Sequence, residues 1–340
     1  MSNIIPLIDT LRLEKIDDAI YFSKKYSNYI SNSRLSLINP EQDGSPEKFF
    51  EGFKPSFSSS FQLGSAVHQL VLQNDLFELS PLTSKPTAKV GMIADYIYNK
   101  CKGEIPTDDM ILEAARVNDY YKGNLSENQI QTVIAKCKNY WTERADFEAS
   151  YTGDKELIHL DFRSRETVCN CVTAINSNKY IQEILHPSNP LYTPISENEQ
   201  AILLDIKVNS ENGDSFILKF KAKLDNYIID KDSNKIIVND VKTIGKFINE
   251  MENNISKFHY NREFAVYAYL LSLCAQKYYG MSNFKVEGNY LCVSTIPSYY
   301  TKVIPLTHKM FKEGMDEFKK LMALVIKEVE TNHRDFAYEI

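Results

Sequence analysis

Two carboxylates and a lysine in the second half of the chain fall where they can meet. Asp225 ends the stretch FILKFKAKLD, and Asp240 and Lys242 lie in IVNDVKT. Strand alternation places Asp225 opposite the apolar face of the first stretch, and places Asp240 and Lys242 on one face of the second. The short polar turn at 231–234 makes the two strands antiparallel neighbours. We therefore expect the three side chains to converge at one end of a hairpin.

This grouping has a chemical use. Mg²⁺ takes oxygen ligands in near-octahedral geometry, and one or two carboxylates normally hold it in proteins. A bound metal polarises a phosphoryl oxygen and lowers the pKa of the attacking water, and a neighbouring lysine can orient or deprotonate that water. An Asp-x-Lys on a strand is more often a solvated surface, so the second carboxylate on the adjoining strand is the feature that favours a site. Two carboxylates, a lysine two residues past the second and a bound metal are together sufficient for phosphodiester hydrolysis.

Other residues have both a structural and a functional interpretation. His68 lies in the apolar helical string FQLGSAVHQLVL, where a single histidine is more often a hydrogen-bonded core residue than a metal ligand. Lys219, Lys221 and Lys223 form a solvated sheet face or line the path of a nucleic-acid backbone. Tyr267 packs within its helix or stacks on a single-stranded base. The residue types alone leave each pair of interpretations open.

The bulk composition is that of a globular protein and excludes some site classes. The chain has 340 residues, of which 43% are hydrophobic and 25% charged, with a net charge of −6. Apolar runs are too short to span a bilayer, so we expect a soluble, cytoplasmic protein. Six cysteines are scattered without a CxxC pair, which argues against a structural zinc or iron–sulfur site. The negative net charge requires any nucleic-acid enzyme to concentrate its positive charge locally.

The order of predicted elements indicates an α/β fold. We expect helices over 11–31, 61–72, 164–185, 258–279 and 308–331, a loop over 39–60, and a largely helical stretch over 88–150 with a Ser126–Gln129 capping box. Strands are expected from Glu199 to Lys242, with an Asn212-Gly213 turn, and in NYLCVST and YTKVIPL. The prediction is a central mixed sheet of about four or five strands flanked by helices. A mainly helical part, 1–190, and a core, 191–340, would form one integrated domain.

Four motifs in this order resemble a known group of enzymes. The segments YISNSRLSLINPE, GSAVHQLVLQND, LKFKAKLDNYIID with IIVNDVKT, and REFAVYAYLL are similar to the RecE/RecB-like exonuclease branch of the PD-(D/E)XK nuclease superfamily. The resemblance runs from about residue 29 to 271 and is weakest over 75–190. It implies a restriction-endonuclease-like core, to which the helical N-terminal part contributes the His68 helix.

The resemblance also implies roles for individual residues. His68, Asp225, Asp240 and the carbonyl of Val241 would be metal ligands, and Lys242 would be the catalytic lysine. The family often has a glutamine four residues before a tyrosine on the next helix. Here Glu263 holds that place before Tyr267, so its role departs from the pattern. Glu199 matches a glutamate often found at the first strand and is a weaker candidate.

The activity that the resemblance implies is a Mg²⁺-dependent exonuclease, with Mn²⁺ as a substitute, that digests duplex DNA from its ends 5′ to 3′. Partners would be a single-strand annealing protein and further copies of the chain in a ring, in phage-type recombination within a bacterial or phage-infected cell. Two alternatives remain: a structure-specific or restriction-type endonuclease of the same fold, and a DNA-binding protein without catalysis. An iron–sulfur nuclease is discarded, because the first cysteine, Cys101, follows the histidine helix.

Overall fold

The computed structural model describes residues 3–52, 58–101, 106–117, 120, 126–188, 194–210 and 215–338. These fall into two compact units. The sheet unit comprises Met1–Pro55 and Ala174–Ile340, and the helical unit comprises Ser56–Thr173. The expected Asn212-Gly213 turn lies outside the described residues.

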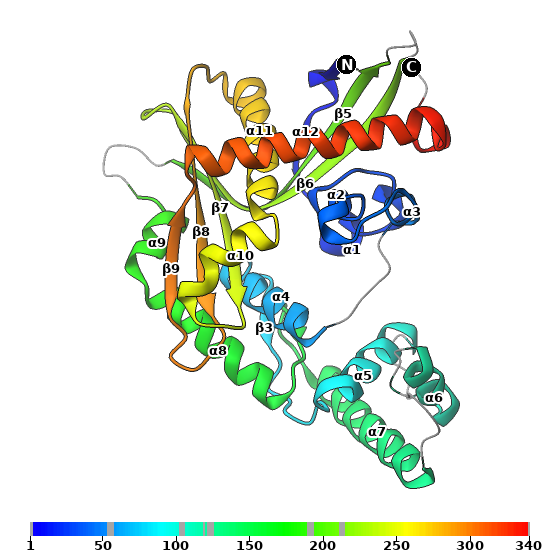
Figure 1. The fold of residues 1–340 in the computed structure, drawn as a ribbon. Helices are drawn as coiled ribbons and strands as arrows, with labels where there is room; N and C mark the ends of the chain where they lie inside the picture. The colour runs from blue at the N-terminus through cyan, green and yellow to red at the C-terminus, as the bar shows by residue number, and fades with distance from the viewer. Residues whose placement is uncertain are drawn as a thin grey trace. The chain divides into compact units, whose positions relative to one another are not determined.

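A seven-stranded mixed sheet forms the centre of the sheet unit (Figure 1). Its order is β1-β5-β6-β7-β8-β9, with β2 also paired to β5. All neighbours are antiparallel except β7 and β8. The strands are β1 (Asn3–Pro6), β2 (Arg12–Lys15), β5 (Ile195–Asn209), β6 (Ser215–Asp230), β7 (Lys235–Ile244), β8 (Lys285–Ser294) and β9 (Thr301–Pro305). The predicted mixed α/β class is confirmed, and the sheet has two strands more than the five expected.

The predicted alternation of β6 is present, with one face of the strand packed in the hydrophobic core. Leu218, Phe220, Ala222 and Leu224 of β6 are all at most 3% exposed and belong to the main hydrophobic cluster. Burial of apolar surface of this kind is the main stabilising contribution to such a sheet. The same alternation turns the intervening side chains, including Asp225, to the other face of β6.

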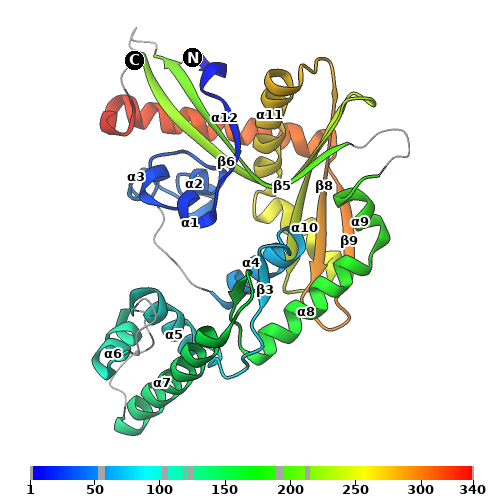
Figure 2. The same ribbon diagram turned by 180° about the vertical axis from the view of Figure 1, so that it is seen from behind.

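Helices flank the sheet. The helix α12 (His308–Thr331) packs against α11 (Tyr260–Tyr279), and it crosses α11, β5 and β6 in both views (Figures 1 and 2). Phe318 of α12 packs edge-on against Phe220, with ring centroids 5.8 Å apart, and Phe264 of α11 packs on Tyr290 of β8 at 5.0 Å. The shorter helices of this unit are α1 (Asp18–Tyr21), α2 (Asn32–Ser36), α3 (Pro46–Glu51), α9 (Lys179–Leu185) and α10 (Met251–Lys257), with 3-10 turns at Ile8–Thr10, Lys24–Tyr26, Pro40–Gln42, Ile248–Glu250 and Arg334–Phe336.

The helical unit has its own core. Its elements are α4 (Ser59–Leu72), α5 (Ala88–Cys101), α6 (Asp108–Val117), α7 (Glu127–Ser150), most of α8 (Phe162–Ser177), and a small parallel pair, β3 (Phe77–Leu79) with β4 (Glu156–Ile158). Apolar residues of α5, α6 and α7, among them Ile97, Ile111 and Trp141, form a closed cluster. The predicted Ser126–Gln129 capping box is present at the start of α7.

The N-terminal prediction of one helix over 11–31 is wrong. Arg12–Lys15 instead forms β2 and pairs antiparallel with Gln200–Leu203 of β5, followed by the single turn of α1 and a 3-10 turn. The open edge of β5 offers unpaired backbone groups, and pairing with them outweighs the weak helical periodicity of this segment.

Two further predictions need correction. The expected helix over 164–185 is broken at Asn178, whose side chain accepts hydrogen bonds from the backbone of Tyr180 and Ile181 and begins α9. The stretch over 88–150 contains three separate helices. The strands β1 and β2 of the N-terminal segment belong to the sheet unit, and the expected division of the chain near residue 190 stays a prediction. No helix among the described residues is both long and apolar enough to cross a membrane.

Candidate metal centre

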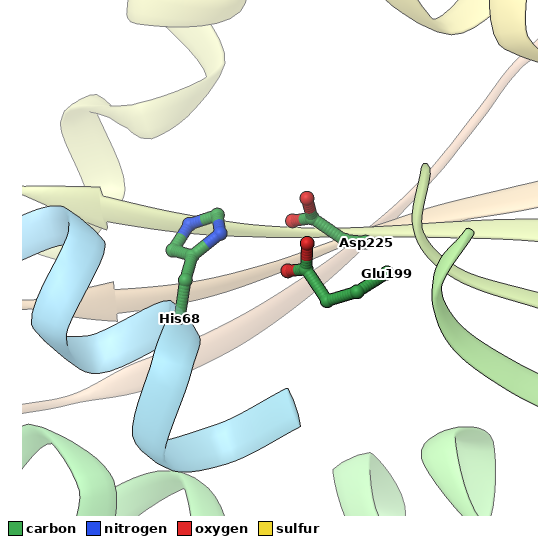
Figure 3. A group of neighbouring side chains, drawn as sticks. All are labelled: His68, Glu199 and Asp225. Carbon is green, nitrogen blue, oxygen red and sulfur yellow. The ribbon is translucent and has the colours of Figure 1, made fainter. Parts of the chain in front are cut away.

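Glu199 of β5 and Asp225 of β6 bring two carboxylates together. Each offers an oxygen within 4.8 Å of the other, and both side chains point to the same side of their strands (Figure 3). Glu199 is 9% exposed and has a φ of +55°, the left-handed region that costs a β-carbon-bearing residue about 1–2 kcal/mol. A strained backbone at a buried carboxylate is typical of a functional site.

Asp225 is held from the neighbouring strand. Its Oδ2 accepts a hydrogen bond from the backbone N–H of Val241 at 2.7 Å. Regular pairing of β6 with β7 runs from Asp230–Lys235 to Asn226–Asn239, so the side chain of Asp225 takes over where the ladder ends. The predicted convergence of Asp225 and Asp240 at one end of the hairpin is therefore present, while ligation by the Val241 carbonyl stays a prediction.

Asp240 is a buried carboxylate with one oxygen left over. It is 2% exposed, and its Oδ1 accepts a hydrogen bond from Lys242 Nζ at 2.9 Å. Its Oδ2 is buried and has no hydrogen-bond partner among the described residues. Burial, followed by the charges of Asp225 and Glu263, outweighs Lys242 and raises the pKa of Asp240 to about 8. An unpaired buried carboxylate oxygen beside further carboxylates is a donor set that fits a hard divalent cation.

Lys242 lies in the middle of this group. Its Nζ is 2.9 Å from Asp240 and 3.1 Å from Glu263, and lies over the ring of Tyr260 at 4.9 Å. Burial opposes the charged form of Lys242, but the carboxylates of Asp240, Glu263 and Asp225 outweigh it and raise its pKa well above the ordinary value. The lysine is therefore an ammonium ion here, which favours an orienting or charge-stabilising role over a general base.

Glu263 links the lysine to the helix α11. Its second carboxylate oxygen accepts a hydrogen bond from the hydroxyl of Tyr267 at 3.2 Å, one turn later. Burial and then the charge of Glu263 raise the pKa of Tyr267 well above the ordinary value, so the hydroxyl stays protonated and donates. This contact places Tyr267 behind Glu263, while base stacking by Tyr267 stays a prediction.

Two of the three lysines of β6, Lys221 and Lys223, contact the N-terminal segment. Lys221 is 8% exposed, donates to the carbonyl of Tyr21 at 2.8 Å, and has its pKa lowered to about 8 by burial and by Arg34. Lys223 pairs with Glu199 at 2.8 Å and also with Asp18. Lys219 lies over the ring of Tyr338 at 3.9 Å. The sequence alone did not indicate Asp18 or Tyr260, because their contacts depend on distant segments.

The balance of charge in this group is negative. Its carboxylates are Glu199, Asp225, Asp240 and Glu263, and its ammonium groups are Lys223 and Lys242. If all four carboxylates were ionised, they would exceed the two ammonium groups by two negative charges, the charge that one divalent cation neutralises; without a cation, the raised pKa of Asp240 lets a proton offset part of this excess near neutral pH. A buried excess of this kind is costly unless a cation or protons offset it.

His68 lies in α4 of the helical unit and is half-buried. It is the third side chain labelled in Figure 3. Coordination of a metal by His68 together with the carboxylates stays a prediction.

Comparison with known proteins finds a distant structural likeness. No protein-family model matches the chain, and no curated protein matches it. Among solved structures, the chain is similar to one from Eubacterium rectale named "Putative exonuclease", with a TM-score of 0.48 and 12% identity, over 94% of this chain and 88% of the other.

Proposed function

We propose that this chain is a Mg²⁺-dependent nuclease of the PD-(D/E)XK type that hydrolyses DNA from duplex ends. The observation that carries the proposal is the row of carboxylates formed by the buried Glu199 and Asp240 and the half-buried Asp225, with Lys242 beside it. A purely structural cluster has no need for a buried carboxylate oxygen that lacks a hydrogen-bond partner, as the Oδ2 of Asp240 does among the described residues. Digestion from ends, 5′ to 3′, follows from the resemblance in the sequence.

Oxygen donors for the metal would come from Glu199, Asp225 and Asp240, with His68 of α4 as the nitrogen ligand. Mg²⁺ bound there would supply polarisation of the scissile phosphate and a lowered pKa for the attacking water. Lys242, held as an ammonium by Asp240 and Glu263, would orient that water and stabilise the negative charge that develops on the phosphate. Tyr267 would keep Glu263 in place.

Partners belong to the same proposal. Duplex DNA ends would be the substrate, and a ring of copies and a single-strand annealing protein would be the assembly. The engaged state of Lys221 and Lys223 leaves Lys219 as the lysine of β6 that we assign to the phosphate backbone.

The test is degradation of end-labelled linear duplex DNA with Mg²⁺, beside a covalently closed circle. Wild type should shorten linear DNA and spare the circle, and Lys242→Ala and Asp240→Asn should lower the rate by about 10²-fold or more. Lys246→Ala is the matched control, because Lys246 follows β7 two residues beyond its last residue and its side chain is 58% exposed. His68→Gln should weaken metal binding.

Each other outcome has a definite meaning. Cleavage of the circle would replace the exonuclease by an endonuclease with the same site. A wild type that binds DNA but cleaves nothing with Mg²⁺ or Mn²⁺ would refute catalysis and favour a DNA-binding protein.

A further inference from the structure

Four asparagines form one row across the centre of the sheet. Asn198, Asn226, Asn239 and Asn289 lie on β5, β6, β7 and β8, and each is directly opposite the next in the strand register. Their side-chain amides are linked in series: Asn226 Nδ2 donates to Asn198 Oδ1 at 2.8 Å, Asn239 Nδ2 to Asn226 Oδ1 at 2.7 Å, and Asn289 Nδ2 to Asn239 Oδ1 at 2.9 Å. Asn226 and Asn239 are completely buried. We call this row the amide ladder.

The amide ladder lies one residue away from each carboxylate of the candidate metal centre. Asn198 precedes Glu199, Asn226 follows Asp225, and Asn239 precedes Asp240. The ladder therefore runs on the face of the sheet opposite to the carboxylates, directly behind them.

The amide ladder is also the last regular row before the pairing changes. The register of β5 with β6 continues on both sides of Glu199 and Asp225 but omits that position, and the pairing of β6 with β7 stops at Asn226 and Asn239. Like charges placed directly opposite one another destabilise a strand pair. Repulsion between the carboxylates thus works against the very register that brings them together.

Amide side chains are suited to oppose that repulsion. A buried asparagine that donates to one neighbour and accepts from the other is satisfied only in one register, because a slip of one residue turns it to the other face. In a dry interior the loss of such a partner is costly, so the ladder selects one alignment of all four strands.

We propose that Asn226 and Asn239 are positioning residues, whose amide ladder fixes the register that aligns Glu199, Asp225 and Asp240 as metal ligands. That these carboxylates are metal ligands rests on the proposed function, but their alignment can be measured without metal. Its reporter is the backbone N–H of Val241, which donates to Asp225.

The experiment uses the full chain as Asn239→Leu and as the double variant Asn226→Leu with Asn239→Leu. The double variant removes both partners of the central hydrogen bond, so the ladder amides that lose a partner are the half-buried Asn198 and Asn289, whereas the single variant also leaves the Oδ1 of the fully buried Asn226 without its donor. The double variant should therefore fold more readily than the single one. Asn178→Ala is the control, because it removes hydrogen bonds of a helix start in the same unit, away from the ladder. Titration with Mn²⁺ alone measures affinity, hydrogen exchange measures protection of the Val241 amide, and thermal unfolding measures stability.

The expected result is a loss of Mn²⁺ affinity of about tenfold or more in the ladder variants and faster exchange at Val241, with neither change in Asn178→Ala at comparable stability. Ladder variants that keep wild-type affinity and Val241 protection would overturn the inference, since the asparagines would then contribute stability alone. If wild type itself fails to bind Mn²⁺, the proposed function is refuted, and faster exchange at Val241 in the ladder variants still supports their positioning role.

Discussion

Two buried groups of charged residues, one in each unit, have opposite designs. The acidic cluster of the sheet unit holds four carboxylates against Lys223 and Lys242. The balanced cluster of the helical unit pairs Lys85 with Asp95 at 2.7 Å and Arg144 with Glu148 at 2.7 Å, so its charges cancel.

The balanced cluster also keeps its histidine neutral. Nε2 of His159 lies 3.1 Å from Glu148, but burial and then the charge of Arg144 lower the pKa of His159 to about 4. Lys85 donates as well to the carbonyl of His159 at 2.8 Å, and Gln62 donates to Asp95 at 2.9 Å.

This difference indicates that the charges of the balanced cluster stabilise the fold, whereas those of the acidic cluster serve function. A balanced cluster needs nothing further and links the helices of its unit. The acidic cluster stores unfavourable repulsion that a bound cation relieves, which is the pattern of sites that trade stability for activity. Substitutions should therefore act in opposite directions in the two clusters.

The largest effect is expected for Asp240→Asn. Nuclease activity should fall by about 10²-fold or more, while the melting temperature in chelator should stay equal or rise, because burial and the charges of Asp225 and Glu263 disfavour the ionised form of Asp240, which the amide cannot adopt. Asp230→Asn, a buried aspartate at the far end of β6, is the control and should keep its activity. A marked fall in stability of Asp240→Asn would contradict the comparison.

Acid should act on the balanced cluster through His159. Its folded pKa of about 4 is below the ordinary value of 6.5, so the unfolded chain takes up the proton first. Stability from neutral His159 is complete above pH 6.5 and is lost as pH falls towards 4, by about 1.4 kcal/mol per pH unit at the steepest. Denaturant unfolding of His159→Gln should lack this slope, and the exposed His308→Gln should retain it. Equal slopes in all three proteins would show that His159 is not buried in its neutral form.

Asp95→Asn should destabilise the helical unit. The change leaves Lys85, 7% exposed, without its ionic partner, and we expect a loss of about 2 kcal/mol in the free energy of unfolding. Asp146→Asn, an exposed position of α7, serves as the comparison and should change stability little. Mn²⁺ affinity measured on folded Asp95→Asn should equal that of wild type, and a weaker affinity would assign the balanced cluster a part in the site.

The smallest effect is expected at the strained position of β5. Glu199→Gly removes the left-handed strain and should raise the free energy of unfolding of the metal-free protein by about 1 kcal/mol, while metal affinity falls. Glu197→Gly, two residues earlier on the same strand, relieves no strain and should lower stability by a similar amount. A destabilised Glu199→Gly would show that the side chain contributes more than its backbone costs.

Much of the acidic cluster could be predicted from local pattern. Alternation in β6 and β7 placed Asp225, Asp240 and Lys242 at one hairpin end, because a period of two residues needs only neighbours in sequence. Glu199 was a weaker candidate, since the direction of its side chain depends on a left-handed φ that the residue type does not predict. The burial of Lys221 depends on a contact with Tyr21, 200 residues earlier. The predicted N-terminal helix gave no reason to expect this contact.

The amide ladder is a second feature that could not be predicted from the sequence. Asparagine in a strand pattern normally indicates a solvent-facing position, so Asn226 and Asn239 gave no sign of burial. Their role depends on alignment across four strands, which the sequence contains only as separate residues. The short strand β2, with charged residues at three of its four positions, likewise has meaning only as a cover for the edge of β5.

The place of the helical unit within the chain has a consequence for how the protein is made. Asn3 of β1 is paired with Asn209 of β5, and the whole helical unit lies between them in sequence. At synthesis rates of about 5–20 residues per second, the first strand waits roughly ten seconds or longer before its partner leaves the ribosome. The helical unit, rich in local contacts, has time to fold during that wait. Nascent chains should thus acquire a protease-resistant helical core first, and β1 should pair with β5 only afterwards.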